Sequence, residues 1–328
     1  MKVAQQAVML GAMHPNFYAL GAVALWATLA SLGVLLQHVP PFLLTGLSLV
    51  IGSLLALPAL LRSWQQWRQW RIAPAALALG VLTFFGYHFF LFIALRMAPS
   101  VEVNLVNYLW PLLMVVLAPL YLPGVVLRPV HWFAAVLGFA GAALAILGAT
   151  QLGANQLGAA QVETGGPALA SAAASAAGVG VAQWGLPNAL GYALAGLSAL
   201  IWANFSLQTR RAASRGKHVP TAAIGLFGLV AGLLSLLCHA LMEPPVVLAS
   251  RDWLLLALMG LGPLGAAFFL WDKALKAGDA RQIGILSYLT PLGSTALLIL
   301  VSGRPLTWST ALAAAMILGA AVLGARAR

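Results

Sequence analysis

The sequence predicts an all-α polytopic membrane protein, in which ten transmembrane helices form two inverted five-helix repeats around a central cavity, with both termini cytoplasmic. Three observations predict it: an apolar composition, an internal duplication and an uneven distribution of basic residues. Of the 328 residues, 62% are hydrophobic and 7% are charged, whereas an average globular domain has roughly 25% charged residues. So few charges cannot cover a water-exposed surface, and most of the chain is therefore expected to face lipid.

Ten apolar stretches are long enough to cross a bilayer, which takes about 20 residues of helix. Pro and Gly residues interrupt the sequence between them. The stretches are 17–36, 42–61, 73–95, 101–122, 131–149, 189–208, 220–241, 253–275, 282–301 and 308–325.

The two halves of the chain resemble each other. The segment GYHFFLFIALRMAPSVEVNLVNYLWP (86–111) matches GAAFFLWDKALKAGDARQIGILSYLTP (265–291), and from Ala94 and Ala274 onward the offset is constant at 180. A second match, at an offset of 176, pairs Trp26-Ala27-Thr28 with Trp202-Ala203-Asn204. These matches indicate a duplication.

The duplication divides the chain into four parts: a cytoplasmic N-terminal segment (1–16), a first repeat (17–149), an external Ala/Gly-rich linker (150–187) and a second repeat (188–325). Each repeat contains five spans. Because five is an odd number, the second repeat is inserted upside down relative to the first.

Basic residues predict the orientation. Fourteen of the seventeen Lys and Arg residues lie on the N-terminal side of the predicted membrane, and only Arg96, Arg251 and Arg304 lie on the other. Positive loops stay in the cytoplasm, so both termini are expected there. The net charge of +11 does not indicate nucleic-acid binding, because the basic residues sit in short gaps between apolar runs instead of forming one basic face.

The fourth and ninth spans carry matching polar faces. At 100° per residue, Asn104, Asn107, Tyr108 and Pro111 share one face of the fourth span, and Gly284, Ser287, Tyr288 and Pro291 occupy the corresponding positions of the ninth. Polar groups at this depth are expected to face a wet cavity near mid-membrane. The two prolines free backbone carbonyls that such a cavity tolerates, although a simple packing kink is the alternative.

Aromatic residues extend this candidate cavity. Trp26 and Trp202 lie in mid-span at matched positions, away from the interfaces where Trp usually anchors. Such rings suit a pocket for aromatic or cationic ligands, with ordinary core packing as the alternative. The candidate cavity residues are Trp26, Tyr87, His88, Phe90, Asn104, Asn107, Tyr108, Trp110, Pro111, Trp202, Asn204, Phe268, Trp271, Ser287, Tyr288 and Pro291.

Few residues offer other chemistry. A histidine can titrate near neutral pH, so His88 is the candidate for proton coupling, unless it is only hydrogen-bonded within the bundle. The single cysteine, Cys238, excludes an intramolecular disulfide and a multi-Cys metal site. The sequence contains no HExxH, no Walker GxxxxGK[ST] and no GxSxG. We therefore expect no catalytic residues, metal, cofactor or ATPase subunit, and transport driven by gradients.

The run APSVEVNLVNYLWP (98–111), preceded by Gly86-Tyr87-His88, resembles the drug/metabolite transporter superfamily. Within it, the run is most similar to EamA-type exporters of aromatic amino acids (the YddG type). The resemblance implies a multi-pass protein of the bacterial inner membrane, with a cavity walled by the first four helices of each repeat. The fifth and tenth spans would then be peripheral.

The positions that match the family are Tyr87, His88, Asn104, Asn107, Tyr108, Trp110 and Pro111. The second repeat departs from this pattern, with Thr290 in place of Trp110, Ser287 in place of Asn107 and Ala267 in place of His88. The site is therefore expected to be asymmetric, with the first repeat supplying most side-chain specificity.

The function expected from these features is secondary-active or facilitative export of amino acids, aromatic and other neutral ones, by alternating access. The partners are a small-molecule substrate and the lipid bilayer, and no nucleic acid. The alternative within transport is a multidrug exporter of aromatic or quaternary cations such as paraquat-like compounds. A membrane-embedded enzyme would need a nucleophile or metal cluster that the sequence does not contain.

Overall fold

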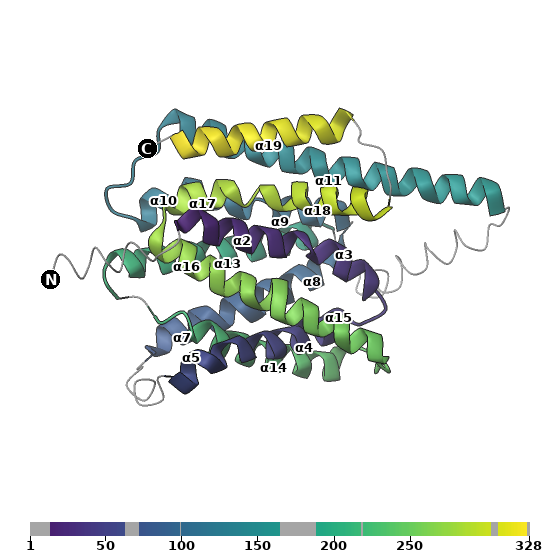
Figure 1. The fold of residues 1–328 in the computed structure, drawn as a ribbon, viewed down its shortest axis with the longest axis horizontal. Helices are drawn as coiled ribbons and strands as arrows, with labels where there is room; N and C mark the ends of the chain where they lie inside the picture. Colours follow the sequence, from purple (N-terminus) through teal and green to yellow (C-terminus); the bar gives the residue numbers. More distant parts are fainter. Residues whose placement is uncertain are drawn as a thin grey trace.

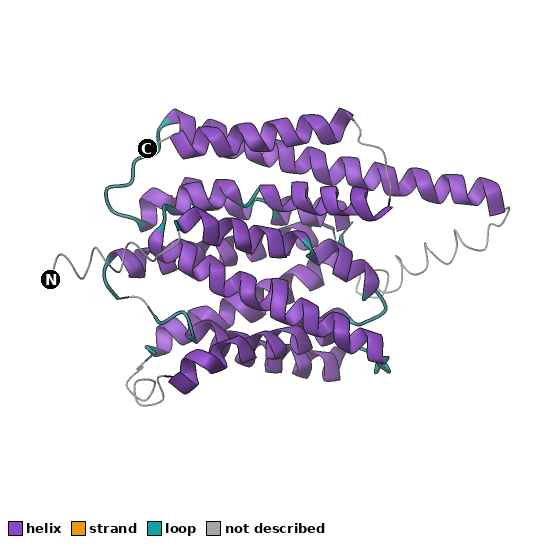
Figure 2. Ribbon diagram, in the orientation of Figure 1, coloured by secondary structure: helices purple, strands orange, loops and turns teal. Residues whose placement is uncertain are grey.

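A computed structural model of the chain describes residues 14–62, 72–98, 100–164, 188–217, 219–302 and 308–326. These residues form helices and loops, and no strand (Figure 2). The helices are α2 (Pro15–Ala27), α3 (Leu29–Leu35), α4 (Pro41–Ser53), η1 (Leu54–Ala56), α5 (Leu57–Arg62), α7 (Pro74–Val81), η2 (Leu82–Gly86), α8 (Tyr87–Met97), α9 (Ser100–Asn107), α10 (Trp110–Tyr121), α11 (Pro129–Thr164), α13 (Asn188–Ser214), α14 (Ala223–Met242), α15 (Ser250–Leu261), η3 (Gly262–Ala266), α16 (Ala267–Ala277), α17 (Ala280–Leu286), α18 (Leu289–Ser302) and α19 (Trp308–Arg326).

Nine helical stretches of the described residues are long and apolar enough to cross a bilayer. They correspond to nine of the predicted spans, and the all-helical, multi-pass architecture is confirmed. The predicted span 282–301 is not among the nine. There the chain forms two helices, α17 and α18, joined by a turn at Ser287 and Tyr288.

Proline residues start many of these helices. Pro15, Pro41, Pro74, Pro111 and Pro129 occupy the first or second position of α2, α4, α7, α10 and α11. The first turn of a helix has no intrahelical partner for its N–H groups, so a residue that lacks this N–H is tolerated there. The same residues that interrupt the apolar runs in the sequence therefore set where the helices begin.

The helices lie roughly side by side in one bundle (Figure 1). The pair α11 and α19 runs along one edge, and α4, α5, α7 and α14 lie at the opposite edge. Between these edges lie α2, α8, α9, α10, α13, α16, α17 and α18. Helix α11 continues to Thr164, well past the predicted end at 149, and its last turns extend beyond the rest of the bundle.

Glycines allow α4 to approach the junction of α15 and η3 very closely. A Cβ on Gly52 would lie 2.6 Å from the carbonyl oxygen of Gly260 and 2.9 Å from Cα of Gly265. A Cβ on Gly260 would in turn lie 2.6 Å from the carbonyl oxygen of Ser48. The backbones touch where any side chain would separate them, which is how small residues let membrane helices pack.

The irregular turns recur at nearly the same sequence offset. Two stretches of π-helix, Leu82–Gly86 and Gly262–Ala266, begin 180 positions apart. Breaks at Tyr108-Leu109 and Ser287-Tyr288 separate α9 from α10 and α17 from α18. π-Helical turns often mark functional sites in helices, and residues next to all of these irregularities line or border the cavity described below.

Candidate functional site

A cavity of about 210 Å³ lies inside the bundle. Its walls come from α2, α3, α8, α9, α10, α13, η3, α16 and α18, together with the break after α9. No described residue of α11 or α19 is among them. The lining residues are Trp26, Leu29, Tyr87, His88, Leu91, Asn104, Asn107, Tyr108, Trp110, Trp202, Leu264, Phe268 and Thr290.

Aromatic rings close one end of the cavity. The ring centroid of Trp26 lies 5.8 Å from that of Trp202, 6.4 Å from that of Trp110, 6.0 Å from that of Phe268 and 5.1 Å from that of Trp271. Most of these pairs are edge-to-face, the arrangement that the ring quadrupole favours. The indole N–H of Trp26 donates to the carbonyl of Pro263 in η3 at 3.1 Å, which fixes the ring at the centre of the cluster.

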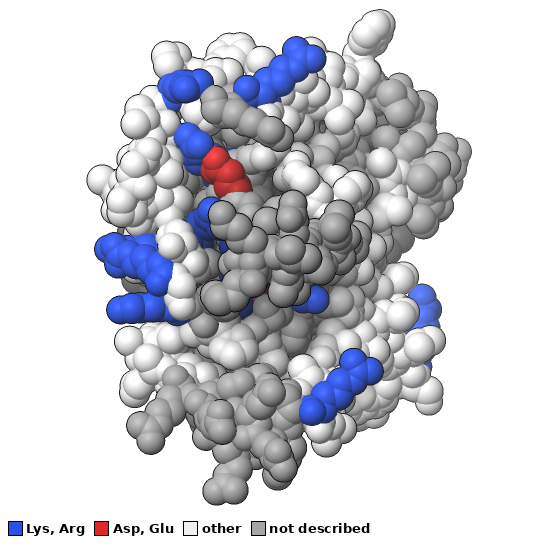
Figure 3. Space-filling view, turned by 60° about the vertical axis from the view of Figure 1, so that its left-hand side comes forward, with Lys and Arg blue, Asp and Glu red and all other residues white. Residues whose placement is uncertain are grey.

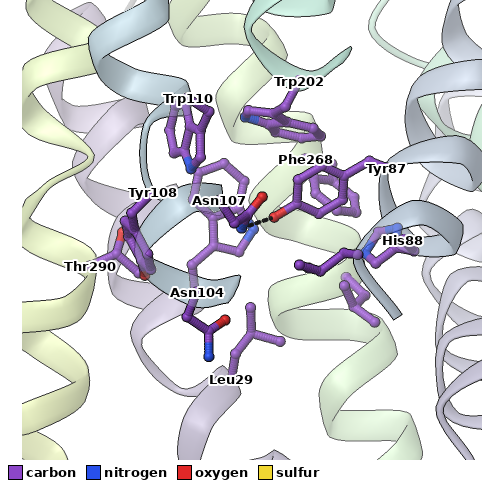
Figure 4. A pocket seen from close by; sticks show the side chains of 13 residues that line it. Leu29, Tyr87, His88, Asn104, Asn107, Tyr108, Trp110, Trp202, Phe268 and Thr290 are labelled. Carbon is purple, nitrogen blue, oxygen red and sulfur yellow. Dashed lines mark hydrogen bonds between the residues drawn. The ribbon is translucent and has the colours of Figure 1, made fainter. Parts of the chain in front are cut away.

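Polar groups occupy the wall formed by α8 and α9. Asn107 donates from Nδ2 to the hydroxyl of Tyr87 at 3.0 Å, and its Oδ1 accepts from Ser198 Oγ at 3.0 Å (Figure 4). Both ends of this amide are therefore engaged inside the protein. Asn107 positions the Tyr87 ring against the cavity, and its side-chain oxygen is already used by Ser198.

His88 is held by the π-helical turn that precedes it. Its Nδ1 lies 2.7 Å from the carbonyl oxygen of Phe84. A carbonyl can only accept, so Nδ1 carries the proton. In the neutral ring, Nε2 is then left as an acceptor. The proton-coupling role predicted for His88 stays a prediction, because this geometry fits both a coupling group and a fixed cavity wall.

The structure brings nine of the sixteen candidate residues together around the cavity: Trp26, Tyr87, His88, Asn104, Asn107, Tyr108, Trp110, Trp202 and Phe268. All but Trp202 and Phe268 come from the first half of the chain. That the first repeat supplies most of the side-chain specificity stays a prediction.

Trp271 and Asn204 are not among the residues that line the cavity. Trp271 packs beneath Trp26 and Trp110 and donates from its indole nitrogen to Ser206 Oγ at 3.2 Å. The side-chain oxygen of Asn204 accepts from the hydroxyl of Tyr121 at 2.8 Å. Trp271 therefore supports the aromatic wall from behind, whereas Asn204 makes its bond outside the cavity lining.

The remaining candidates lie elsewhere. Tyr288 is fully buried against α11 and α19, where its ring fits beside Gly138. The hydroxyl of Ser287 donates to the carbonyl of Gly284 at 2.6 Å. Pro111 and Pro291 lie just beyond the helix breaks, and Phe90 packs on Phe89.

Four lining residues were not predicted: Leu29, Leu91, Leu264 and Thr290. Nothing in the local sequence distinguishes the leucines from those that face lipid. Thr290 did carry a signal, because it stands where the first repeat has Trp110. The ninth span thus presents Thr290 to the cavity, and not the predicted Ser287 and Tyr288.

The cavity is accessible from the end of the bundle where Arg96 lies. Leu29, Leu91 and Asn104, the lining residues nearest that end, are partly exposed. Trp26, Trp202 and Phe268, at the opposite end of the cavity, are buried. Behind them Trp271 and Phe84 are each 1% exposed, so the aromatic cluster seals the other side.

Known proteins resemble this chain over most of its length. The model of the EamA-like transporter family matches residues 14–147 and again residues 189–325. The aromatic amino acid exporter YddG of Ancylobacter novellus is 38% identical over 302 residues, which cover 92% of this chain and 93% of the relative. The protein of the same name from Escherichia coli is 25% identical over 257 residues, covering 77% of this chain and 78% of the relative.

A solved crystal structure of another protein has the same fold. It superimposes with a TM-score of 0.77 at 34% identity and covers 94% of this chain and 96% of the other. Two family matches that together span most of the chain, and a relative of this similarity, agree with the helical bundle and its internal cavity. The chain is a transporter rather than an enzyme, and it belongs to the EamA-like transporter family.

Proposed function

We propose that this protein exports aromatic amino acids, tryptophan among them, and other neutral amino acids across the bacterial inner membrane by alternating access. The observation that carries this proposal is the chemistry of the cavity. Its described walls combine aromatic rings with neutral polar groups, and none of them is Lys, Arg, Asp or Glu. Such a site suits a zwitterion of zero net charge that has an aromatic side chain.

The alternative substrate class is aromatic or quaternary cations. A cation site of this kind would depend on the faces of Trp and Tyr alone, because the described lining residues include no carboxylate. The cavity also presents amide, hydroxyl and imidazole groups, which a quaternary cation cannot use as hydrogen-bond partners. The polar groups therefore favour an amino acid.

Alternating access is supported by comparing matched positions of the two halves. Leu29 corresponds to Phe205, and Asn104 corresponds to Gly284. Leu29 and Asn104 are partly exposed at the accessible end of the cavity, whereas Phe205 and Gly284 are buried on the sealed side. An exchange of conformation between inverted repeats would open the sealed side at Phe205 and close the cavity at Leu29.

The orientation in the membrane follows from charge. Helix α2 begins and α19 ends at the left-hand end of the bundle in Figure 1. Lys and Arg side chains gather over this end (Figure 3). The last turns of α5, α13, α16 and α19 carry Arg62, Arg211, Lys276 and Arg326 there. Basic ends stay cytoplasmic, so the cavity is proposed to open to the outside.

Transport is tested by measuring uptake of labelled tryptophan into proteoliposomes, with and without an imposed pH gradient, against empty liposomes. Uptake above background supports the proposal, and acceleration by the gradient makes His88 the next residue to test. Uptake of a labelled quaternary cation in place of tryptophan would favour the alternative. If neither compound enters in the presence of folded protein, the proposed function is overturned.

The sealed side is tested by cysteine labelling in a Cys238→Ser background, because Cys238 is the only cysteine of the chain. A membrane-impermeant thiol reagent should modify Leu29→Cys from the outside. It should modify Phe205→Cys only from the cytoplasmic side, and faster during transport. Labelling of both positions from the same side would argue against alternating access.

A further inference from the structure

One hydroxyl in the cavity wall has no hydrogen-bond partner in the protein. Thr290, the second residue of α18, is 7% exposed, and its Oγ1 is unpaired. Of the buried side-chain polar atoms left without a partner in the described part of the chain, only this one belongs to a residue that lines the cavity. An unpaired buried hydroxyl is unfavourable, and a helical Thr can usually bond to a carbonyl of the preceding turn instead. The position of the Thr290 hydroxyl in the cavity wall suggests that it forms a hydrogen bond to a ligand.

Asn104 offers the second free polar group on the same side of the cavity. It lines the cavity, and its side-chain amide has no hydrogen bond to any described residue, in contrast to Asn107, whose amide is used by Tyr87 and Ser198. Figure 4 shows Thr290 and Asn104 at the left of the cavity and His88 at the right. A hydroxyl and an amide nitrogen both donate hydrogen bonds.

The opposite wall has the complementary character. In the neutral ring of His88, Nδ1–H donates to Phe84 and Nε2 is an acceptor. A carboxylate placed against Nε2 would meet a lone pair, whereas an ammonium group would meet a partner. The carboxylate of a zwitterion therefore fits at Thr290 and Asn104, with its ammonium toward His88 and its ring on the aromatic cluster.

Accordingly, and resting on the proposed function, we propose that Thr290 and Asn104 form the subsite that recognises the α-carboxylate of the transported amino acid. The charge is held by neutral donors, since the described lining residues include no Lys or Arg. Thr290 thereby gives a role to the difference between the two halves of the chain, because Trp110, at the matched position of the first half, has no hydroxyl.

The test compares three ligands on purified protein by competition with labelled tryptophan: tryptophan itself, tryptamine, which lacks the carboxylate, and indole-3-propionate, which lacks the amine. Thr290→Val removes the hydroxyl at nearly constant volume, and Thr290→Ser keeps it. Asn104→Ala is the second variant of the subsite. Ser235→Ala is the matched control, because Ser235 is a buried hydroxyl without a partner that lies in α14, away from the cavity. For Thr290→Val the binding constants are measured directly with labelled tryptophan and labelled tryptamine.

Thr290→Val and Asn104→Ala are each expected to weaken tryptophan and indole-3-propionate roughly tenfold or more, the effect of one hydrogen bond to a charged group, and to leave tryptamine unchanged. Thr290→Ser and Ser235→Ala should bind all three ligands as the unaltered protein does. Equal weakening of all three ligands, or no weakening, overturns the subsite alone. Failure of the unaltered protein to bind tryptophan overturns the proposed substrate instead.

Discussion

Arg96 and Lys276 each form an ion pair with a buried carboxylate, at opposite ends of the bundle. They are 180 positions apart, the offset at which the two halves of the sequence align. The guanidinium of Arg96 donates to Glu243 Oε1 at 3.1 Å. Lys276 Nζ lies 2.5 Å from Asp272 Oδ2 and also donates to the carbonyl of Val219 at 2.6 Å. Arg96 thus pairs with Glu243 at the end of α14, whereas Lys276 pairs with Asp272 of its own helix, α16.

At the end of the bundle where Arg96 lies, Glu243 is the residue that the surrounding polar groups contact. Its side chain is 1% exposed, and its two oxygens accept from the backbone N–H groups of Phe42 and Leu43 at the start of α4. His239 lies 3.0 Å from Oε2. A single carboxylate therefore joins α4, α8 and α14 at the accessible end of the cavity.

Glu243→Gln should destabilise the protein by about 1–3 kcal/mol, because one of the two buried oxygens that accept from the N–H groups of Phe42 and Leu43 becomes a donor. Thermal unfolding of the purified protein in detergent measures this loss of stability. Asp279→Asn is the control, since the Asp279 side chain is 40% exposed and pairs with Arg281, two residues away, and partly exposed ion pairs contribute roughly 0–1 kcal/mol. Equal losses for both variants would contradict the central role of Glu243.

Gly52→Ala should lower stability by about 1–3 kcal/mol, the usual cost of overpacking. The added methyl group would meet the backbone of Gly260 and Gly265, which cannot move aside as a flexible side chain can. Gly33→Ala is the matched control, because nothing lies within 4 Å of the position its Cβ would take and Ala favours helix over Gly. A melting temperature that is the same for both variants would show that α4 and α15 are not packed backbone to backbone.

Asn107→Ala and Tyr87→Phe should each impair tryptophan transport, and the double variant should be no worse than Asn107→Ala alone. Both changes break the same hydrogen bond, so their effects are not additive. Initial rates at several tryptophan concentrations give the comparison. Asn204→Ala, which loses a bond to Tyr121 outside the cavity lining, is the control. Additive losses in the double variant would mean that Asn107 does not act through Tyr87.

Asp279 should make stability depend on pH in the acid range. Burial alone would raise the pKa of Asp279, but hydrogen bonds from the backbone N–H and guanidinium of Arg281 outweigh it and hold the pKa below its usual value. A depressed pKa contributes stability above the unfolded value of about 3.9, and this contribution is lost as the pH falls through the folded-state pKa. Asp279→Asn should remove this part of the unfolding profile. If the stability of Asp279→Asn depended on acid pH as that of the unaltered protein does, the role assigned to Asp279 would be refuted.

Much of the candidate site was predictable because the sequence match between the two halves marks positions independently of their neighbours. Trp26 and Trp202 were singled out as a matched pair, and their rings lie 5.8 Å apart. The polar face of the fourth span was predictable from helical periodicity, and Asn104, Asn107 and Tyr108 do share the cavity. These inferences needed only the periodicity of a single helix and the sequence match between the two halves.

The ninth span shows where such reasoning fails. Tyr288 matches Tyr108 in the sequence, but its ring packs between α11 and α19 beside Gly138. That environment depends on a helix about 150 positions earlier in the chain. The break at Ser287 and Tyr288 also resets the helical phase, so that Thr290 faces the cavity. Neither the break nor the partner helix can be read from the span itself.

The most direct test of the account is counterflow of tryptophan. Proteoliposomes loaded with unlabelled tryptophan are diluted into a trace of labelled tryptophan, and internal label is followed over time. A carrier with one cavity that opens alternately to each side should drive a transient accumulation of label above its equilibrium level, and Trp110→Ala should diminish it. Label that only rises to equilibrium, as through a pore, or that does not enter, would contradict the account.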